Sequence, residues 1–230
     1  MSLVKFPLED RPSDSSFVER VWRAHSERTG TFLSQAKSCW EMVVTRHEGQ
    51  TMLTVRGPET KVTPMDVQWT EGEFVGIDFR LGTFLPHLPP GQVMDLRDAN
   101  LPEASSTSFW LCGSAWPYPD YDNADTFVDR LVRTGLLVRD PVVEAVLQGR
   151  PHEMSPRSVQ YRFVQATGLS YRTIQQIERA RQAAALLEQG WSIPDVVYQA
   201  RYFDQPHLTH ALQRFLGQTP AQIARGNQPE

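Results

Sequence analysis

The residue types that catalyse reactions do not form a recognisable active-site pattern in this chain. No Ser/His/Asp or Cys/His arrangement, phosphate-binding glycine loop or dinucleotide fingerprint stands out. His25, His47 and His87 are isolated from one another, and His207 and His210 alone offer too few ligands for a metal ion. We therefore expect no enzyme, no cofactor and no metal site.

Hydrogen bonding by exposed polar side chains is the chemistry that the sequence favours instead. In residues 155–168, Val159, Phe163 and Ala166 recur at helical spacing and predict one buried stripe. A row of polar side chains is left on the outer side of this helix: Arg157, Gln160, Tyr161 and Gln165. Such a row is suited to recognising another molecule.

Capping residues define the helices that position these side chains. Ser155 before Pro156, and Gly168 at the end, bound the first helix. A longer helix over 170–189 keeps the 3.6-residue period. Further start and stop signals are Ser192, Asp204, Gly217 and Thr219 before Pro220. This pattern of helix start and stop residues occurs twice, about 50 residues apart, which indicates duplication of a small recognition module.

Three segments then resemble the DNA-binding domain of the AraC/XylS family of transcription regulators: QYRFVQATGLS, ERARQAAALL and YFDQPHLTHALQRFLGQTPAQI. The resemblance covers roughly residues 140–224. It implies two helix-turn-helix units, at about 140–168 and 192–217, joined by helix 170–189. Helices 155–167 and 204–216 would enter successive major grooves of one DNA duplex.

The resemblance also assigns contact residues. The side chains expected to reach bases are Arg157, Ser158, Gln160 and Tyr161 in the first recognition helix, and Gln205, Thr209 and His210 in the second. The side chains expected to contact phosphates are Arg172, Arg181, Arg201, Arg214 and Thr219.

Three positions depart from the family pattern. The family commonly has arginine where this chain has Tyr161 and His210, and arginine reads guanine through two hydrogen bonds. The preferred DNA should therefore move away from guanine, with a loss of about 1–3 kcal/mol per missing contact. Arg201 stands where the family turn usually has glycine, so a positive φ there would be strained by about 1 kcal/mol or more.

Composition limits the class of protein. With 230 residues, of which 40% are hydrophobic, the chain is expected to fold into one or two domains. It lacks an apolar run long enough to span a membrane, and its polar N-terminus lacks secretory character. The only two cysteines, Cys39 and Cys112, are expected to be buried structural thiols in a reducing compartment. These features favour a cytoplasmic protein.

Charge is distributed unevenly along the chain. The net charge is −4, but residues 141–230 hold nine basic and seven acidic residues, for a net charge of +2. Residues 1–140 carry the remaining −6. The basic surplus lies in the part that resembles a DNA-binding domain, although it is small, so few phosphate contacts are expected.

The N-terminal half has the character of a small β structure. Between residues 17 and 80, short runs rich in Val, Phe, Trp, Thr and Met are separated by turn residues such as Glu48-Gly49. The pattern predicts an antiparallel sheet or barrel, short helical turns over 84–99, a loop over 104–125 and an amphipathic helix over 122–134. That helix would either pair two copies of the chain or cover the sheet.

The segments CWEMVV, VRGPET and GIDFRLGTF resemble, less closely, the cupin-like sensory domains attached to such regulators. The predicted fold is therefore α+β: a β-rich sensory domain over 1–136 and an all-α DNA-binding domain over 137–226. Trp40, Trp69, Arg80 and Trp110 are candidate residues of a ligand pocket. The alternative is that the tryptophans fill the core and the arginine lies at a solvated strand edge.

The leading functional hypothesis is a sequence-specific transcription regulator whose N-terminal domain senses a small molecule or a partner. The alternative is a relative with degenerate DNA readout that acts through protein contacts. The expected partners are double-stranded DNA, a small-molecule effector, a second copy of the chain and, for an activator, RNA polymerase. A membrane is not expected.

Overall fold

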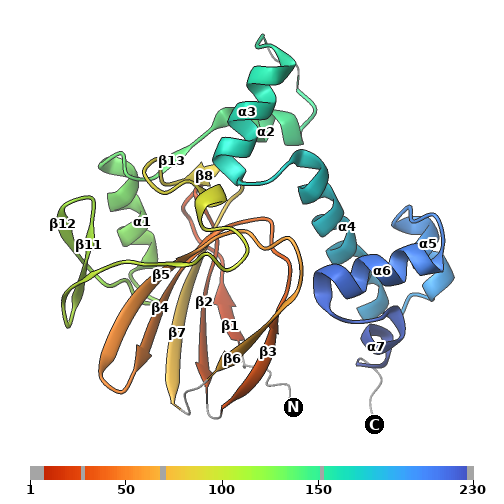
Figure 1. Ribbon diagram of the computed structural model, residues 1–230, viewed down its shortest axis with the longest axis horizontal. Helices are drawn as coiled ribbons and strands as arrows, with labels where there is room; N and C mark the ends of the chain where they lie inside the picture. The colour runs from red at the N-terminus through yellow and green to blue at the C-terminus, as the bar shows by residue number, and fades with distance from the viewer. Residues whose placement is uncertain (1–7, 27–28, 68–70, 151–152, 227–230) are drawn as a thin grey trace. The chain divides into compact units, whose positions relative to one another are not determined.

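The computed structural model describes residues 8–26, 29–67, 71–150 and 153–226, which form two compact units (Figure 1). The first unit contains the described residues up to 32, together with 39–58 and 66–170. The second contains 33–38, 59–65 and the residues from 171 onward. Trp69 lies outside the described residues.

The first unit is built on a six-stranded antiparallel sheet with the order β1-β2-β7-β4-β5-β9 (Figure 1). The predicted turn residues Glu48 and Gly49 join β4 and β5 into a hairpin, in which Met42 of β4 lies opposite Val55 of β5. At its turn, Glu48 and Gly49 have φ values of 47° and 78°, the mirror-image conformation that fits the twist of the strands. The strands are β1 (Leu8–Arg11), β2 (Val18–Ser26), β4 (Glu41–His47), β5 (Gln50–Arg56), β7 (Gly72–Phe79) and β9 (Ala99–Asn100).

One face of this sheet forms the core of the first unit. Alternate residues of its strands, such as Val44 and Ile77, are buried in one cluster with the apolar side of α1 (Ala124–Arg133). Phe127 of α1 lies 6.2 Å from Phe109, centre to centre, and meets it edge to face. The predicted helix over 122–134 is therefore confirmed, and it covers the sheet.

The prediction of a loop over 104–125 was wrong. This segment contains most of a three-stranded sheet of β10 (Glu103–Ser105), β11 (Ser108–Leu111) and β12 (Ser114–Pro117). The strands form because Phe109 and Trp116 alternate with outward residues, while Cys112 and Gly113 adopt the positive φ values of a tight turn. Cys112 is exposed at that turn, so the expectation of a buried thiol was wrong as well.

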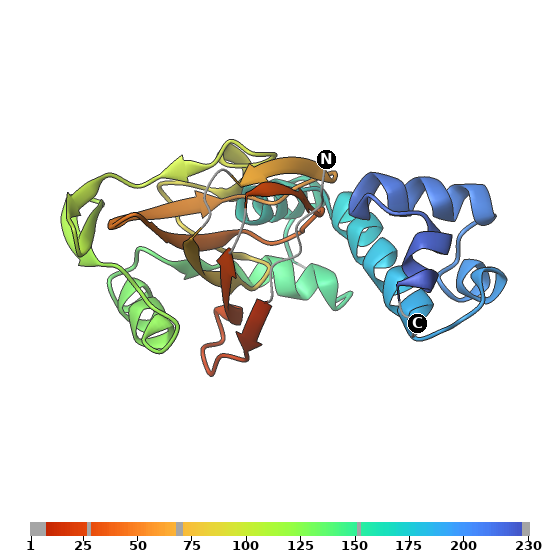
Figure 2. The same ribbon diagram turned by 90° about the horizontal axis from the view of Figure 1, so that it is seen from below.

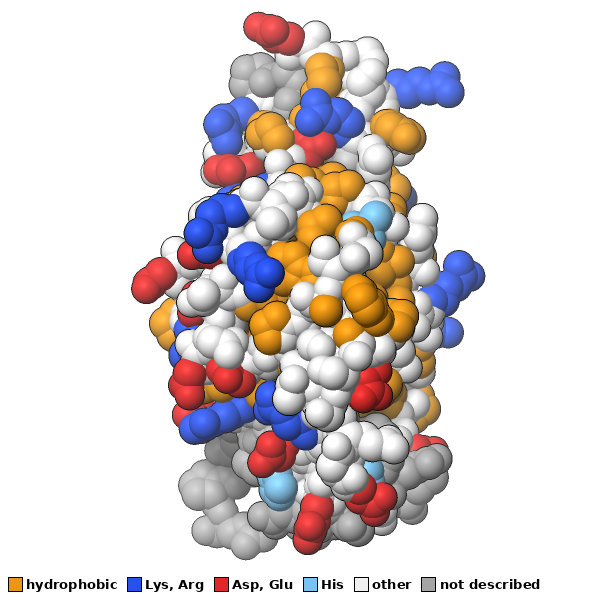
Figure 3. All heavy atoms as spheres, turned by 90° about the vertical axis from the view of Figure 1, so that its left-hand side faces the viewer, with side chains coloured by type: hydrophobic (Ala, Val, Ile, Leu, Met, Phe, Trp, Pro, Cys, Tyr) orange, Lys and Arg blue, Asp and Glu red, His pale blue; other side chains and the backbone are white. Residues whose placement is uncertain are grey.

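The outward face of this small sheet is itself apolar. Trp110, Ala115 and Pro117 are exposed there, and Trp110 lies opposite Ala115. Figure 3 shows hydrophobic side chains gathered on the side of the first unit that carries β11 and β12.

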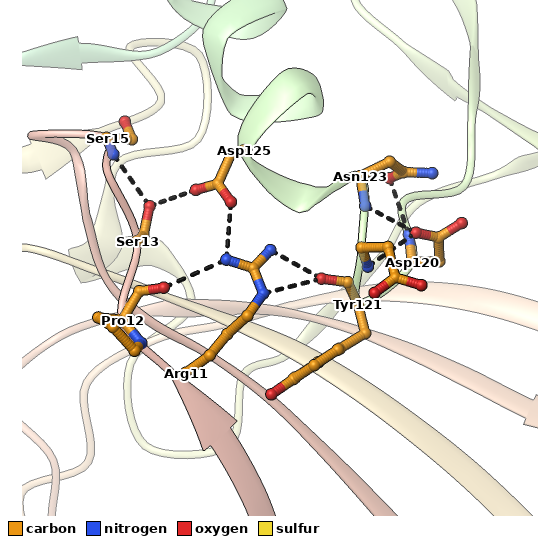
Figure 4. Close-up of polar contacts among 9 residues, drawn as sticks. Arg11, Pro12, Ser13, Ser15, Asp120, Tyr121, Asn123 and Asp125 are labelled. Carbon is orange, nitrogen blue, oxygen red and sulfur yellow. Dashed lines mark hydrogen bonds and ion pairs between the residues drawn. The ribbon is translucent and has the colours of Figure 1, made fainter.

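Arg11 joins the first strand to α1 (Figure 4). Its guanidinium donates to Asp125 at 2.8 Å and to the carbonyl oxygen of Tyr121 at 2.7 Å. Burial acts to raise the pKa of Asp125, but the hydrogen bonds from Ser13 and Arg11 outweigh it and hold that pKa below its ordinary value of 3.8. Asp125 is therefore ionised at neutral pH, and its charged contact with Arg11 holds α1 against the first strand.

The first unit also contains two helices of the C-terminal half, α2 (Pro141–Leu147) and α3 (Pro156–Thr167). Over 84–99 only one helical turn forms, η1 (Pro90–Gln92), so the expectation of several was wrong. Two short two-stranded pairings complete the β structure: β8 (Thr83–Phe84) with β13 (Val138–Arg139), and β3 (Gly30–Ser34) with β6 (Thr63–Val67). The predicted domain boundary between residues 136 and 137 stays a prediction.

The second unit consists of four helices, cyan to blue in Figure 2, with segments 33–38 and 59–65. The helices predicted over 170–189 and 204–216 begin and end within a residue or two of those bounds, and two further helices begin directly after the predicted caps Ser192 and Thr219. The helices are α4 (Tyr171–Glu188), α5 (Ile193–Gln199), α6 (Gln205–Leu216) and α7 (Pro220–Arg225).

The two extended segments contact the C-terminal end of α6. The backbone N–H of Ala36 donates to the carbonyl oxygen of Phe215 at 2.8 Å, and that of Val62 donates to the carbonyl oxygen of Arg214, also at 2.8 Å. The last-turn carbonyls of a helix have no partner inside it, so these bonds satisfy acceptors that would otherwise need water.

Candidate nucleic-acid interface

The first candidate recognition helix, α3, has the two faces that its sequence predicted. The hydroxyl of Ser155 accepts the N–H of Ser158, and Gly168 ends the helix with φ 74°. Phe163 and Ala166 are buried. The predicted base-contacting side chains of this helix are all exposed: Arg157, Ser158, Gln160 and Tyr161.

A charged pair fixes α3 against α2. The guanidinium of Arg162 donates from Nε and Nη2 to the two carboxylate oxygens of Asp140, both at 2.9 Å. Asp140 also caps α2 by accepting the N–H of Val142. This two-pronged bond was missed by the sequence reasoning, although Asp140 before Pro141 is a recognisable cap signal. It links the middle of α3 to the start of α2.

The second candidate recognition helix, α6, lies in the second unit and, like α3, has a capped start, a buried side and a glycine at its end. Asp204 caps it by accepting the N–H of His207 at 2.8 Å. Leu208 and Leu212 are buried, and Gly217 ends the helix with φ 75°. Of the predicted base-contacting side chains, Gln205 and His210 are exposed; Thr209 is half-buried and donates its hydroxyl to the Gln205 carbonyl oxygen.

The turn between α5 and α6 contains Arg201, which stands where the family usually has glycine. The N–H of Tyr202 donates back to the carbonyl oxygen of Val197, which places Arg201 at the left-handed position of a helix-ending motif. Arg201 has φ 55°, so it adopts the positive φ that was expected to be strained for a residue other than glycine. Tyr202 then packs inward, where Arg179 lies over its ring at 4.4 Å. Burial raises the pKa of the Tyr202 hydroxyl, and Arg179 opposes that effect.

The predicted phosphate-contacting side chains occupy varied environments in the second unit. Arg181 is half-buried and donates to the carbonyl oxygen of Ala36 at 3.0 Å. Thr219 caps α7 and accepts the N–H of Gln222. The other three are exposed at the surface of the second unit: Arg172, Arg201 and Arg214.

The described candidate residues of the ligand pocket, Trp40, Arg80 and Trp110, differ in burial and in their contacts. Trp40 is buried, stacks on Phe79 at 4.0 Å and donates its indole N–H to Thr83. Arg80 donates to the carbonyl oxygen of Val18, and Trp110 is exposed on β11. Trp40 thus fills the core, as the alternative interpretation held.

Among the described residues, no group of three His, Cys, Asp or Glu side chains is placed to hold a metal ion. None of the described helices is long and apolar enough to cross a membrane.

The arrangement defines a class of protein. Each candidate recognition helix follows a shorter helix across a turn, is capped at its N-terminus and exposes a row of hydrogen-bonding side chains, as in double helix-turn-helix DNA-binding proteins.

A comparison with protein families supports this class. Residues 152–226 match a family model described as a helix-turn-helix domain, of the AraC type, and this match supports a DNA-binding AraC/XylS-family transcription regulator. Comparisons with curated proteins and with solved structures gave no match.

Proposed function

We propose that this protein is a sequence-specific transcription regulator in which α3 and α6 each read bases in a major groove. The supporting observation is that both helices bury an apolar stripe on one side and expose hydrogen-bonding side chains on the opposite side. The base contacts come from Arg157, Ser158, Gln160, Tyr161, Gln205, Thr209 and His210. The phosphate contacts come from Arg172, Arg181, Arg201, Arg214 and Thr219.

The β-rich part of the first unit would act as a cupin-like sensory domain for a small molecule or a partner. A second copy of the chain and, for an activator, RNA polymerase are further partners in this proposal. The protein would work in the cytoplasm, where its DNA target is reached, and the proposal contains no catalytic step.

Selection of bound duplexes from a randomised DNA pool tests the proposal, followed by affinity measurements on the selected duplex at two salt concentrations. We expect a consensus with two half-elements about one helical turn apart, poor in guanine where Tyr161 and His210 would lie. Each phosphate contact should add about −0.9 to the slope of log K against log salt. Absence of any enriched sequence would contradict sequence-specific readout.

A second candidate function is regulation through protein contacts with degenerate DNA readout. It is favoured by two aromatic side chains of the second helix-turn-helix unit, Tyr198 and Phe203, which are 84% and 90% exposed. Exposed aromatic residues are enriched at protein interfaces. Weak DNA binding without a consensus, together with a partner protein whose binding is lost in Phe203→Ser, would favour this alternative.

A further inference from the structure

A cavity of about 500 Å³, wide open to solvent, lies within the first unit, between the turn that contains η1 and the exposed face of α3. Its volume falls in the range of about 300–1,000 Å³ that is usual for small-molecule sites. We propose that it binds a small carboxylate with a flat apolar body, and that this ligand and DNA exclude one another.

The walls of the cavity are held by backbone contacts. A Cβ atom on Gly168, at the end of α3, would lie 2.9 Å from the backbone nitrogen of Gly91, so the helix and the turn touch directly. The turn itself is anchored because Val93 is buried and its carbonyl oxygen accepts the N–H of Gly57 at 3.0 Å. The fold itself therefore holds the turn against α3, and ligand binding need not order a loop.

The lining indicates what would bind. Pro89, Tyr161 and Val164 supply apolar surface, and the ring of Tyr161 offers a face on which a flat molecule can stack. Arg157 is the one charged residue in the lining, and within the described parts of the chain it has no recorded ion pair. A guanidinium binds a carboxylate through two parallel hydrogen bonds, so an anionic group near Arg157 is favoured.

The same side chains belong to the base-reading face of α3. Arg157, Gln160 and Tyr161 line the cavity, and the proposed function assigns all three to base contacts. They cannot contact a ligand in the cavity and base edges in a groove at the same time. Ligand binding should therefore weaken DNA binding, and DNA should weaken ligand binding by the same factor. This exclusion rests on the proposed function, whereas ligand binding does not.

The first experiment measures binding of naphthalene-2-carboxylate to the full chain without DNA, with the neutral naphthalene-2-carboxamide as the matched probe. We expect the carboxylate to bind at least about tenfold more tightly than the amide. Arg157→Gln should abolish that preference, whereas Arg157→Lys should retain part of it. Equal binding of the two probes would overturn the proposal.

A pair of variants in the turn tests the location without changing α3. Gln92 is exposed and lines the cavity, so Gln92→Trp should fill it and remove binding of both probes. Leu96→Trp, at an exposed position four residues further on and outside the lining, is the matched control and should leave both affinities within about twofold. Far-ultraviolet circular dichroism checks that both variants fold. Unchanged binding of the carboxylate by Gln92→Trp would overturn the proposed location.

The second experiment adds the duplex selected by the protein. Saturating duplex should release the bound carboxylate, and the carboxylate should raise the apparent Kd for DNA in proportion to its occupancy. Simultaneous binding of both would overturn the exclusion. If the protein binds no duplex, the proposed function and the exclusion fail together, while the response of the probes to Gln92→Trp still decides the ligand site.

Discussion

Two single residues of the second unit, Arg201 and His210, depart from the pattern of the AraC/XylS family that this part of the chain resembles. Arg201 is exposed and has φ 55°, a conformation that costs a residue with a Cβ about 1–2 kcal/mol. A glycine would avoid this strain, so the arginine lowers the stability of the fold at this position. A contact between its guanidinium and a phosphate would account for it.

Two substitutions of Arg201 separate strain from charge. Arg201→Gly should raise the free energy of unfolding by about 0.5–1 kcal/mol, because relief of strain exceeds the added chain entropy of glycine. Arg201→Ala keeps the strain and should not stabilise the protein. Both should reduce the salt dependence of DNA binding by about 0.9 in slope. Chemical denaturation and salt titration measure these effects; an unchanged slope in both variants would remove Arg201 from the phosphate contacts.

His210 is the second such residue, exposed on α6 at a position where the family commonly has arginine. His210→Arg should introduce a guanine at one position of the selected consensus and strengthen binding to that DNA by about 1–3 kcal/mol. His210→Lys adds the charge without the paired hydrogen bonds, so it should strengthen binding to all sequences alike. Selection and affinity measurements distinguish the two. A consensus unchanged by arginine would mean that His210 does not face the bases.

At the scale of elements, the C-terminal end of α6 is bonded to two segments that lie far away in the sequence. Segments 33–38 and 59–65 supply hydrogen bonds to its last carbonyls, and side chains of both pack beside Gly217. A Cβ atom on Gly217 would lie 3.0 Å from Leu33 Cδ1 and 3.1 Å from Val62 Cγ2. The end of the candidate recognition helix is thus coupled to the N-terminal half of the sequence.

Two glycines of the second unit provide a matched test of that packing. Gly190 and Gly217 have φ values of 87° and 75°, so alanine should cost about 1–2 kcal/mol at either position. Gly190 has nothing within 4 Å of an added Cβ, whereas Gly217 faces Leu33. Gly217→Ala should therefore destabilise the protein by about 1 kcal/mol more than Gly190→Ala. When Leu33→Ala is added to Gly217→Ala, part of this extra loss of stability should be recovered. If Gly217→Ala and Gly190→Ala destabilise the protein equally, segment 33–38 does not pack beside Gly217 in solution.

The sequence predicted the elements whose signals are local. Ser155, Asp204 and Thr219 cap helices as expected, because a cap depends on bonds to residues two or three positions away. The hairpin turn at Glu48-Gly49 was predictable for the same reason.

The contacts that were missed join residues far apart in the chain. The bond of Arg162 to Asp140 spans 22 residues, and that of Arg181 to Ala36 spans 145. No local pattern specifies such partners. The small sheet around Trp110 was missed because its strands β11 and β12 are only four residues long, so buried and exposed residues alternate over very few positions. Short alternations of this kind also occur in loops.

At the scale of the whole molecule, the two candidate recognition helices belong to different compact units. The first unit contains α3 and the second contains α6, and both lie in one chain with a net charge of −4. The weak positive charge of residues 141–230 gives little non-specific attraction to DNA. Tight binding should therefore require both helices to find their bases on one duplex.

The spacing of the two half-elements tests this requirement. Inserting five base pairs between them rotates one half-element by about half a turn, onto the opposite side of the duplex. The affinity should then fall at least about tenfold, to that of a duplex with one half-element scrambled. A substitution of the intervening bases without a change of length is the control and should have little effect. Full affinity for the five-base-pair insertion would mean that α3 and α6 do not read the same site together, and the second unit would then have to be assigned a separate partner.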